Sequence, residues 1–249
     1  MHGMEQINKT ALVTGGARRI GKAIVQTLHS AGYNVMIHCN RSLSEAEQLC
    51  ALLNAQRDHS ASVVVADLLD MDAFDSVVTQ TISQFKSLDV LVNNASTFYP
   101  TKLATIDQAA WTDLIGSNLK APLFLAKAAA PALQSSAGSI INIIDIYAQR
   151  PLANHTIYCA AKAGLEMLTK SLARDLAPVV RVNGVAPGAI LWPENEDHPL
   201  DAAELVKTIP MRRLGDPSDI AQTVLFLATQ APYITGQIIA VDGGRSIVP

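Results

Sequence analysis

The sequence predicts an α/β protein with a doubly wound parallel sheet, a Rossmann-like single domain of three α/β/α layers spanning residues 1–249. Short runs of β-branched residues alternate with longer stretches in which apolar residues recur at helical spacing. Runs such as VVVA at 63–66 and INII at 141–144 are apolar over most of their length. This indicates strands buried on both faces, as in a parallel sheet covered by helices. Repeated strand–helix–strand units then favour a doubly wound sheet.

The alternation predicts the order of the elements along the chain. We expect strands at 10–14, 34–38, 62–66, 88–92, 138–144, 180–185 and 237–241. The helices are expected at 19–31, 43–55, 71–85, 111–133, 157–176 and 217–229. A polar insertion at 187–210 contains four prolines. Its composition, and its place after a strand, predict a lid over a site at 189–210.

The composition excludes several classes of function. The chain has a formal net charge of −3, which gives no electrostatic footprint for nucleic acid or an anionic membrane. Only 16% of residues are charged against a usual ~25%, so surface is buried between layers or between subunits. The cysteines and histidines are too scattered for a disulfide framework or a metal site. No run reaches the roughly 18 apolar residues of a membrane span, and residues 1–9 lack a secretion signal, so we expect a cytoplasmic protein.

The first predicted strand runs into a glycine turn at residues 15–21 (GGARRIG) that leads into a helix. Such a turn brings backbone N–H groups to a phosphate at the helix N-terminus. Gly15 would form the turn, and Gly21 would allow close packing of the helix on the strand. The first strand of a β-α-β series is where a dinucleotide-binding turn is expected.

The end of the second predicted strand indicates the kind of dinucleotide. NAD-binding proteins place a carboxylate there to accept hydrogen bonds from the ribose hydroxyls. In this chain Asn40-Arg41-Ser42 follows the strand, and no acid occurs before Glu45. Arg41 and Ser42 can instead donate to a 2′-phosphate, the arginine with a planar fork. The sequence therefore favours NADP(H).

A tyrosine and a lysine, Tyr158 and Lys162, are four residues apart and share one face of a predicted helix. A nearby cation stabilises a phenolate. We therefore expect Lys162 to lower the pKa of Tyr158 toward a range useful for acid–base catalysis.

These motifs together resemble the short-chain dehydrogenase/reductase family over residues 10–244. The matching positions are Thr14-Gly15 with Gly21, the run 93–96 (NNAS), Asn118, Tyr158 with Lys162, and Pro187-Gly188. Two positions depart from the usual pattern: Arg19 stands where a third glycine is usual, and Asp145 where a serine is usual. A serine can only orient a carbonyl by hydrogen bonding. A carboxyl group can also donate or relay a proton, which suits reduction of a C=N bond.

Taken jointly, the departures resemble the pteridine reductase branch of that family. They are Arg18-Arg19 in the glycine turn, His38-x-Asn40-Arg41-Ser42 after the second strand, the run 93–100 (NNASTFYP), and Asp145 ahead of Tyr158. The resemblance implies NADPH as cofactor and a pterin or folate as substrate. Reduction from the dihydro to the tetrahydro form would deliver hydride to a carbon of the pyrazine ring. It also implies a homotetramer that pairs the long helices at 111–133 and 157–176.

The resemblance further implies the roles of individual residues. Tyr158 and Asp145 would pass a proton to the ring nitrogen, Lys162 would bind the nicotinamide ribose, and Asn118 would hold a proton-relay water. Phe98 and the nicotinamide would sandwich the flat pterin. The implied substrate contacts are Arg19, Ser96, Phe98, Asp145, Tyr158 and Trp192. The implied cofactor contacts are Gly15, Arg18, Arg19, Ile20, Gly21, His38, Asn40, Arg41, Ser42, Asp67, Leu68, Asn93, Ala95, Ser96, Tyr158, Lys162, Pro187 and Gly188.

Two alternatives stay open. A carbonyl reductase of the same fold, such as a 3-oxoacyl reductase, would share most of these motifs, and Asp145 in the serine position argues against it. A non-catalytic NADP(H)-binding sensor would be expected to have lost Tyr158 or Lys162, and both are present. Which pterin or folate is preferred is left open.

Overall fold

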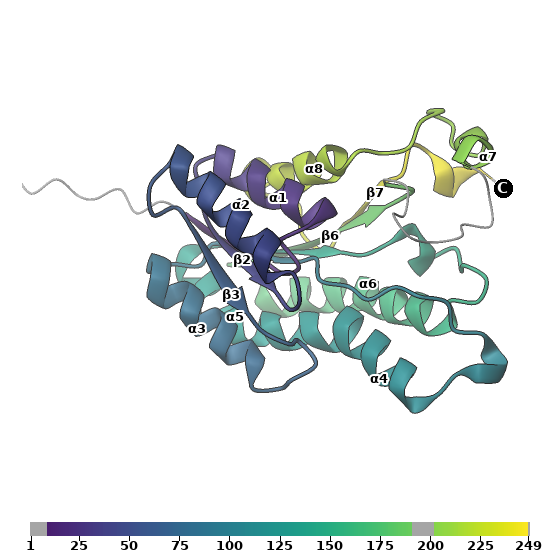
Figure 1. The fold of residues 1–249 in the computed structure, drawn as a ribbon, viewed down its shortest axis with the longest axis horizontal. Coiled ribbons are helices and arrows are strands. Elements are labelled where there is room, and N and C mark those ends of the chain that lie inside the picture. Colours follow the sequence, from purple (N-terminus) through teal and green to yellow (C-terminus); the bar gives the residue numbers. More distant parts are fainter. Residues whose placement is uncertain (1–8, 191–201, 249) are drawn as a thin grey trace, which may run out of the picture.

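One parallel sheet organises the fold, as Figure 1 shows. The computed structural model describes residues 9–190 and 202–248. The strands in this part of the chain have the order β3-β2-β1-β4-β5-β6-β7, and every neighbouring pair is parallel. Their bounds are β1 Thr10–Val13, β2 Asn34–Cys39, β3 Ala61–Val65, β4 Val90–Asn93, β5 Ser139–Ile143, β6 Arg181–Pro187 and β7 Ile238–Val241. The predicted doubly wound sheet is confirmed.

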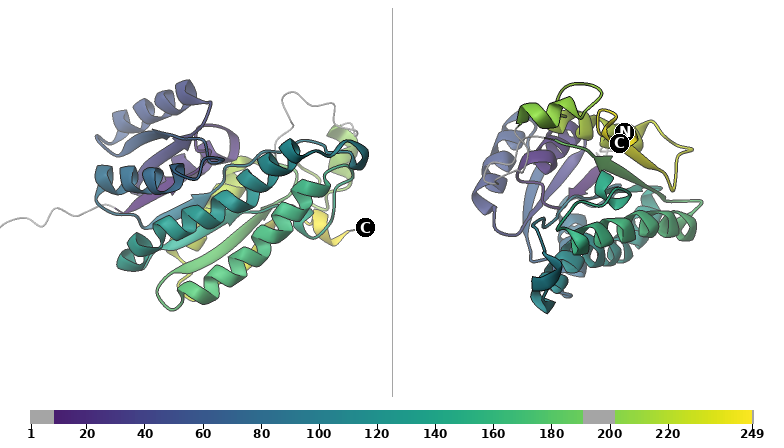
Figure 2. Two further views of the ribbon diagram at one scale, coloured as in Figure 1. Left: turned by 90° about the horizontal axis from the view of Figure 1, so that it is seen from below. Right: turned by 90° about the vertical axis from the view of Figure 1, so that its right-hand side faces the viewer.

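Helices cover both faces of the sheet. One face carries α1 (Arg19–Ser30), α2 (Leu43–Gln56) and α8 (Pro217–Thr229), and the other carries α3 (Ala73–Phe85), α5 (Ala121–Ser136) and α6 (Thr156–Leu176), the latter packed against α4 (Gln108–Ile115). The end-on view in Figure 2 shows the sheet between these two layers. None of the described helices is long and apolar enough to cross a membrane.

The sheet has an apolar core on each of its two faces, because successive side chains of a strand point to opposite faces. Val13 packs into the core under α1 and α8, whereas its neighbour Leu12 packs into the core under α3 and α5. Successive strand side chains point to opposite faces, so a strand between two helix layers needs apolar residues at every position. This is the physical reason for the continuous apolar runs in the sequence.

The predicted helix at 111–133 differs from the structure. The helical segment begins earlier, at Gln108, and is interrupted by a π-helical turn, η2 (Gly116–Lys120), between α4 and α5. Two features favour the wider turn: Pro122 has no N–H for the helical ladder, and the Asn118 side chain donates to the carbonyl of Leu114 at 3.0 Å. Single π turns inside helices are frequently found at functional sites.

In its described residues, the predicted insertion at 187–210 contains a helix, α7 (Ala202–Lys207). Residues 191–201 lie outside the described part of the chain, and Trp192 is among them. The lid at 189–210 therefore stays a prediction. Three short turns complete the described structure: η1 (Leu103–Thr105), η3 (Ile146–Ala148) and η4 (Arg245–Ile247).

Candidate active site

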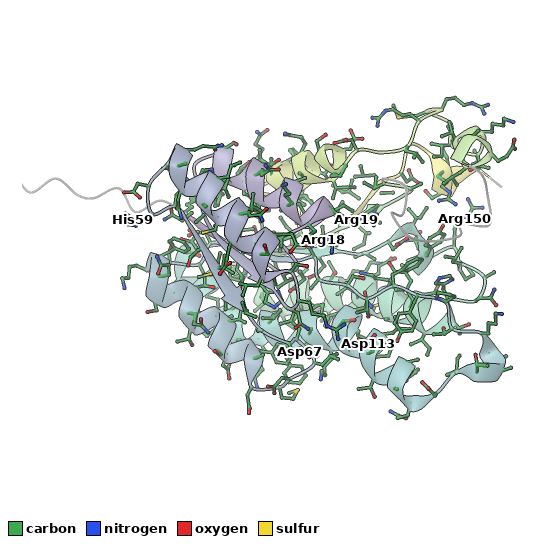
Figure 3. All side chains as sticks on the ribbon, in the orientation of Figure 1. Arg18, Arg19, His59, Asp67, Asp113 and Arg150 are labelled. Carbon is green, nitrogen blue, oxygen red and sulfur yellow. The ribbon has the colours of Figure 1, made fainter. Side chains whose placement is uncertain are left out.

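A cleft of about 550 Å³ opens where the carboxyl ends of β1, β2, β3 and β4 meet. The strand order reverses between β1 and β4, and ligands of open α/β sheets bind at such a switch point. Figure 3 labels three of the lining side chains, Arg18, Asp67 and Asp113. The cleft residues predicted from sequence are Gly15, Arg18, His38, Asn40, Arg41, Ser42, Asp67, Leu68, Ala95 and Ser96. Cofactor contact by each of them stays a prediction, but the fold brings them to one cavity.

The glycine turn requires its glycines for two different reasons. Gly15 has a φ of +58°, in the left-handed region that favours glycine. A Cβ added to Gly21 would lie 2.1 Å from the carbonyl oxygen of Gly15, so any side chain would push α1 away from the turn. Arg19, which stands where the family usually has glycine, adopts a φ of +51°. The chain therefore keeps the left-handed backbone of that position while adding a guanidinium there.

Asn94 ties β4 to the glycine turn, a role that the sequence analysis did not assign. Its side-chain amide donates to the carbonyls of Thr14 and Gly15 at 2.8 and 3.0 Å. The Thr14 hydroxyl accepts from the N–H groups of Asn94 and Ala95 at 2.9 and 3.0 Å. The doubled asparagine at 93–94 was the available signal, but which of the two faces the turn depends on the tertiary fold.

His38 supports the glycine turn from β2. The N–H of Gly15 donates to its Nδ1 at 3.2 Å, and Nε2 lies 3.1 Å from the Ala66 carbonyl. The ring is therefore neutral, with the proton on Nε2. Burial lowers the pKa of His38 to about 4. Both ring nitrogens are engaged by backbone groups, so His38 supports the cleft through Gly15.

The loop after β2 presents cationic and hydroxyl groups to the cleft. Asn40, Arg41 and Ser42 line it, and the Arg41 side chain is exposed. Glu45, the first acid after β2, lies 3.9 Å from the guanidinium of Arg18. No carboxylate of this loop therefore occupies the position from which an NAD-binding protein contacts the ribose.

Asn118 joins the π turn to the loop after β4. Its amide nitrogen donates to the Thr97 carbonyl at 2.9 Å, and its oxygen accepts from the Ser96 hydroxyl at 2.6 Å. The Thr97 hydroxyl lies 2.6 Å from that of Ser117. Asn118 therefore fixes the loop that carries Ser96 and Phe98 to the helix beneath it. Thr97, Asp113 and Ser117 also line the cleft and were not predicted.

The fold brings Asp145 and Tyr158 into direct contact. Tyr158 Oη donates to Asp145 Oδ2 at 2.7 Å, and the N–H of Tyr147 donates to Asp145 Oδ1 at 2.9 Å. Lys162 is almost fully buried; its ammonium group donates to the Ile143 carbonyl at 3.0 Å and lies 5.6 Å from the Tyr158 ring centroid. The Tyr158 phenol is hydrogen-bonded to the Asp145 carboxylate and lies beside the buried ammonium group of Lys162. This arrangement can transfer a proton.

The predicted lowering of the Tyr158 pKa is wrong. The pKa of Tyr158 lies well above its usual value, because burial and the neighbouring Asp145 carboxylate both disfavour the phenolate. The expected lowering by Lys162 is absent. Burial also raises the pKa of Asp145, against the opposing hydrogen bonds and cations, and lowers the pKa of Lys162 to about 8. Tyr158 is therefore a neutral O–H donor.

Phe98 contacts Tyr158 and His155. Its ring stacks on His155, with centroids 4.7 Å apart and planes 14° apart, and meets the edge of Tyr158 at 4.8 Å. It is 39% exposed, so part of its surface is open for a further planar group.

The remaining predicted residues serve the scaffold in this structure. Asn93 is buried and donates to Asn142 on β5, and Ile20 packs on the core under α1. Pro187 ends β6, and a Cβ on Gly188 would lie 2.6 Å from the Cβ of Asp242. Among the described residues no group of histidine, cysteine and acidic side chains could hold a metal ion.

A family model described as enoyl-(acyl carrier protein) reductase matches residues 15–246. The chain belongs to the short-chain dehydrogenase/reductase family, whose reductases use NAD(P)H, and it is an oxidoreductase of that family.

Two kinds of reductase have the same percentage identity to the chain. It is 38% identical to pteridine reductase 1 of Leishmania tarentolae, over 95% of this chain and 96% of that protein. It is also 38% identical to a 3-oxoacyl-(acyl-carrier-protein) reductase of Staphylococcus aureus, over 96% of this chain and 98% of that protein. An uncharacterized oxidoreductase of Bacillus subtilis is 32% identical over 96% of this chain.

Proposed function

We propose that this protein is an NADPH-dependent reductase of pterins, converting a dihydropterin or dihydrofolate to its tetrahydro form. The observation that carries the proposal is the hydrogen bond from Tyr158 to Asp145. Reduction of a C=N bond places a proton on nitrogen, and a carboxyl–phenol pair can deliver one. The similarity to a protein named pteridine reductase 1 supports the same substrate class.

The cleft fits NADPH in three respects. The left-handed turn at Gly15 leads into the N-terminus of α1, where backbone N–H groups can bind a phosphate, and the absence of a side chain at Gly21 lets α1 pack closely on that turn. Arg18 adds positive charge in the cleft, Arg19 lines a neighbouring hollow that it shares with Arg18, and Arg41 stands at the end of β2 for the 2′-phosphate. When bound, NADPH supplies the hydride.

The chain's own residues orient the substrate and hold the proton. Phe98 offers a flat apolar face, with Ser96 beside it, to a planar heterocycle. Tyr158 keeps its proton on Oη until the substrate nitrogen accepts it, and Asp145 holds that hydroxyl in place. Asp145, whose pKa is raised by burial, takes up a proton from solvent and returns it to the Tyr158 phenolate. Lys162 supplies positive charge that stabilises the ionised carboxylate of Asp145.

A 3-oxoacyl reductase is the second candidate, favoured by the equal identity to that enzyme of Staphylococcus aureus. Asp145 argues against this candidate. A hydroxyl group at that position is enough to orient a carbonyl substrate, so carbonyl reduction does not need a carboxyl group there. A non-catalytic NADP(H) sensor is disfavoured because Tyr158 and Lys162 are both present and adjacent.

The decisive experiment measures NADPH oxidation with dihydrobiopterin, dihydrofolate and an acetoacetyl thioester under one set of conditions. We expect the largest kcat/KM with one of the first two. Tyr158→Phe should lower that turnover roughly 100- to 10,000-fold, because it removes the proton donor. Turnover of the thioester alone would replace the pterin assignment by the second candidate. Undiminished turnover by Tyr158→Phe would remove the proposed donor.

We further propose a homotetramer in the cytoplasm. Apolar side chains stand exposed on the helices predicted to pair, Trp111 on α4 at 49% and Met167 on α6 at 63%. Sedimentation equilibrium checks the assembly, and a monomer would contradict it.

A further inference from the structure

The last described residues fold back toward the catalytic aspartate. Asp242 shapes the turn: its carboxylate accepts from the N–H groups of Gly244 and Ser246 at 2.9 and 2.6 Å. Gly243 and Gly244 have φ values of +63° and +86°, which glycine adopts without strain. The turn continues into η4, which carries Arg245.

Arg150 fastens this C-terminal turn to the segment after β5. Its Nη1 donates to the backbone carbonyls of Arg245 and Ser246 at 3.1 and 3.0 Å, and also to that of Val248. Figure 3 shows Arg150 close to the C-terminal end of the chain. One guanidinium thus joins two segments that are far apart in sequence.

The side chain of Arg245 then lies over Tyr147, which follows Asp145 by two positions. The guanidinium carbon is 5.7 Å from the centroid of the Tyr147 ring. The N–H of the same Tyr147 donates to Asp145. Arg245 is thereby held over the residue whose N–H binds the Asp145 carboxylate, and its charge acts on that carboxyl group.

Two cations oppose the effect of burial on Asp145. Burial raises the pKa of its carboxyl group, and the charges of Lys162 on α6 and Arg245 on η4 lower it. Tyr158 and Tyr147 are the other titratable groups that face it. Lys162 is committed to the Ile143 carbonyl and to the Tyr158 ring. Arg245 is the cation supplied from a separate element.

We propose that the C-terminal turn belongs to the proton-donating machinery, in which Arg245 is a positioning residue for the Asp145–Tyr158 pair and Arg150 holds it there. This inference rests on the proposed function, since it takes Asp145 and Tyr158 as the proton-donating pair. It adds a positive charge that opposes the effect of burial on the Asp145 carboxyl group.

The test compares the pH dependence of kcat in Arg245→Gln, Arg245→Lys and Arg150→Gln. The matched control is Arg174→Gln, an exposed arginine at the far end of α6, about 24 Å along the helix from Tyr158. The substrate is whichever of dihydrobiopterin and the acetoacetyl thioester the wild type reduces, so failure of the pterin assignment leaves the test intact. Carbon NMR of aspartate-labelled protein, assigned with Asp145→Asn, follows the carboxyl group without any turnover.

Loss of the Arg245 guanidinium raises the pKa of Asp145. We therefore expect the pH profile and the NMR titration to move upward by about half a pH unit or more in Arg245→Gln and in Arg150→Gln. Arg245→Lys and Arg174→Gln should keep the wild-type values. An Arg245→Gln titration that superimposes on the wild type overturns the proposal. An equal shift in Arg245→Lys overturns the role of charge, and an unshifted Arg150→Gln overturns the role of the clamp.

Discussion

At the scale of single residues, the site depends on where the chain departs from the usual family pattern. Arg19 occupies a left-handed backbone position that glycine would occupy without strain. Arg41 stands where an NAD-binding protein would place an acid. Asp145 replaces a hydroxyl with a carboxyl group that contacts Tyr158. Arg41 adds charge to the cleft, Arg19 adds charge to a neighbouring hollow, and Asp145 adds proton-transfer capacity at Tyr158.

Backbone strain at Arg19 is testable by comparing two variants that both lose the guanidinium. Arg19→Gly should be about 1 kcal/mol more stable than Arg19→Ala, because only alanine keeps the Cβ that disfavours a φ of +51°. Chemical denaturation measures the difference. Equal stabilities would show that this position carries no strain. Both variants should bind NADPH more weakly than the wild type.

Arg41 is expected to select the phosphorylated cofactor. Arg41→Ala should raise the Kd for NADPH roughly 10- to 100-fold, because a charge-assisted hydrogen bond to the 2′-phosphate is lost. The Kd for NADH should change little. Fluorescence titration with both nucleotides checks this, with Arg174→Ala as the control. An equal loss for NADPH and NADH would mean that Arg41 does not contact the 2′-phosphate.

At the scale of elements, a chain of buried side chains fixes the catalytic helix to the sheet. Asn93 on β4 donates to Asn142 on β5 at 2.8 Å, and Asn142 donates to Thr169 on α6 at 2.8 Å. Tyr158 and Lys162 lie on the same helix as Thr169. The register of α6 against β5 therefore depends on polar groups as well as on apolar packing.

The hydrogen bond from Asn142 to Thr169 predicts that replacing Thr169 lowers stability more than replacing a threonine without such a partner. Thr169→Val leaves the buried Asn142 amide without its acceptor and should cost ~1–3 kcal/mol of unfolding free energy. Thr81→Val on α3 is the matched control. Thr81 is equally buried and donates to the carbonyl four residues earlier, as Thr169 does, and no described side chain bonds to it. If both variants lose the same stability, the Asn142 bond contributes nothing.

At the scale of the whole molecule, stability is expected to fall in mild acid because histidines are buried in the neutral form. Burial lowers the pKa of His38 to about 4 and also lowers that of His29. The histidines of the unfolded chain have a pKa of ~6.5. Between that pH and about pH 4 the unfolded chain therefore binds more protons than the folded chain. Stability is therefore fully present above about pH 6.5 and is lost as the pH falls toward about 4.

His38→Gln should reduce that loss by about 2–3 kcal/mol between about pH 7.5 and about pH 4.5. Denaturant titrations at the two pH values measure it. His59→Asn is the control, because the His59 side chain is 88% exposed and should leave the wild-type dependence unchanged. If the free energy of unfolding changes with pH equally in His38→Gln and in the wild type, His38 is not the titrating group.

The sequence by itself determined the layers and most of the positions at the cleft. Continuous apolar runs predicted strands covered on both faces, and the glycines of residues 15–21 predicted the turn after β1. Both signals are local, because strand period and left-handed turns are properties of neighbouring residues. The break of the predicted helix at Gly116–Lys120 was missed, since it depends on Asn118 reaching the carbonyls of Leu114 and Thr97.

Only the tertiary structure decided how the charges act on one another. Burial and Asp145 raise the pKa of Tyr158, although its helical neighbour Lys162 alone would lower it. His38 holds Gly15, and Arg245 reaches Tyr147, across long stretches of chain. The physical reason is that pKa values and proton-transfer partners depend on burial and on contacts between distant segments, and neither is encoded in local spacing.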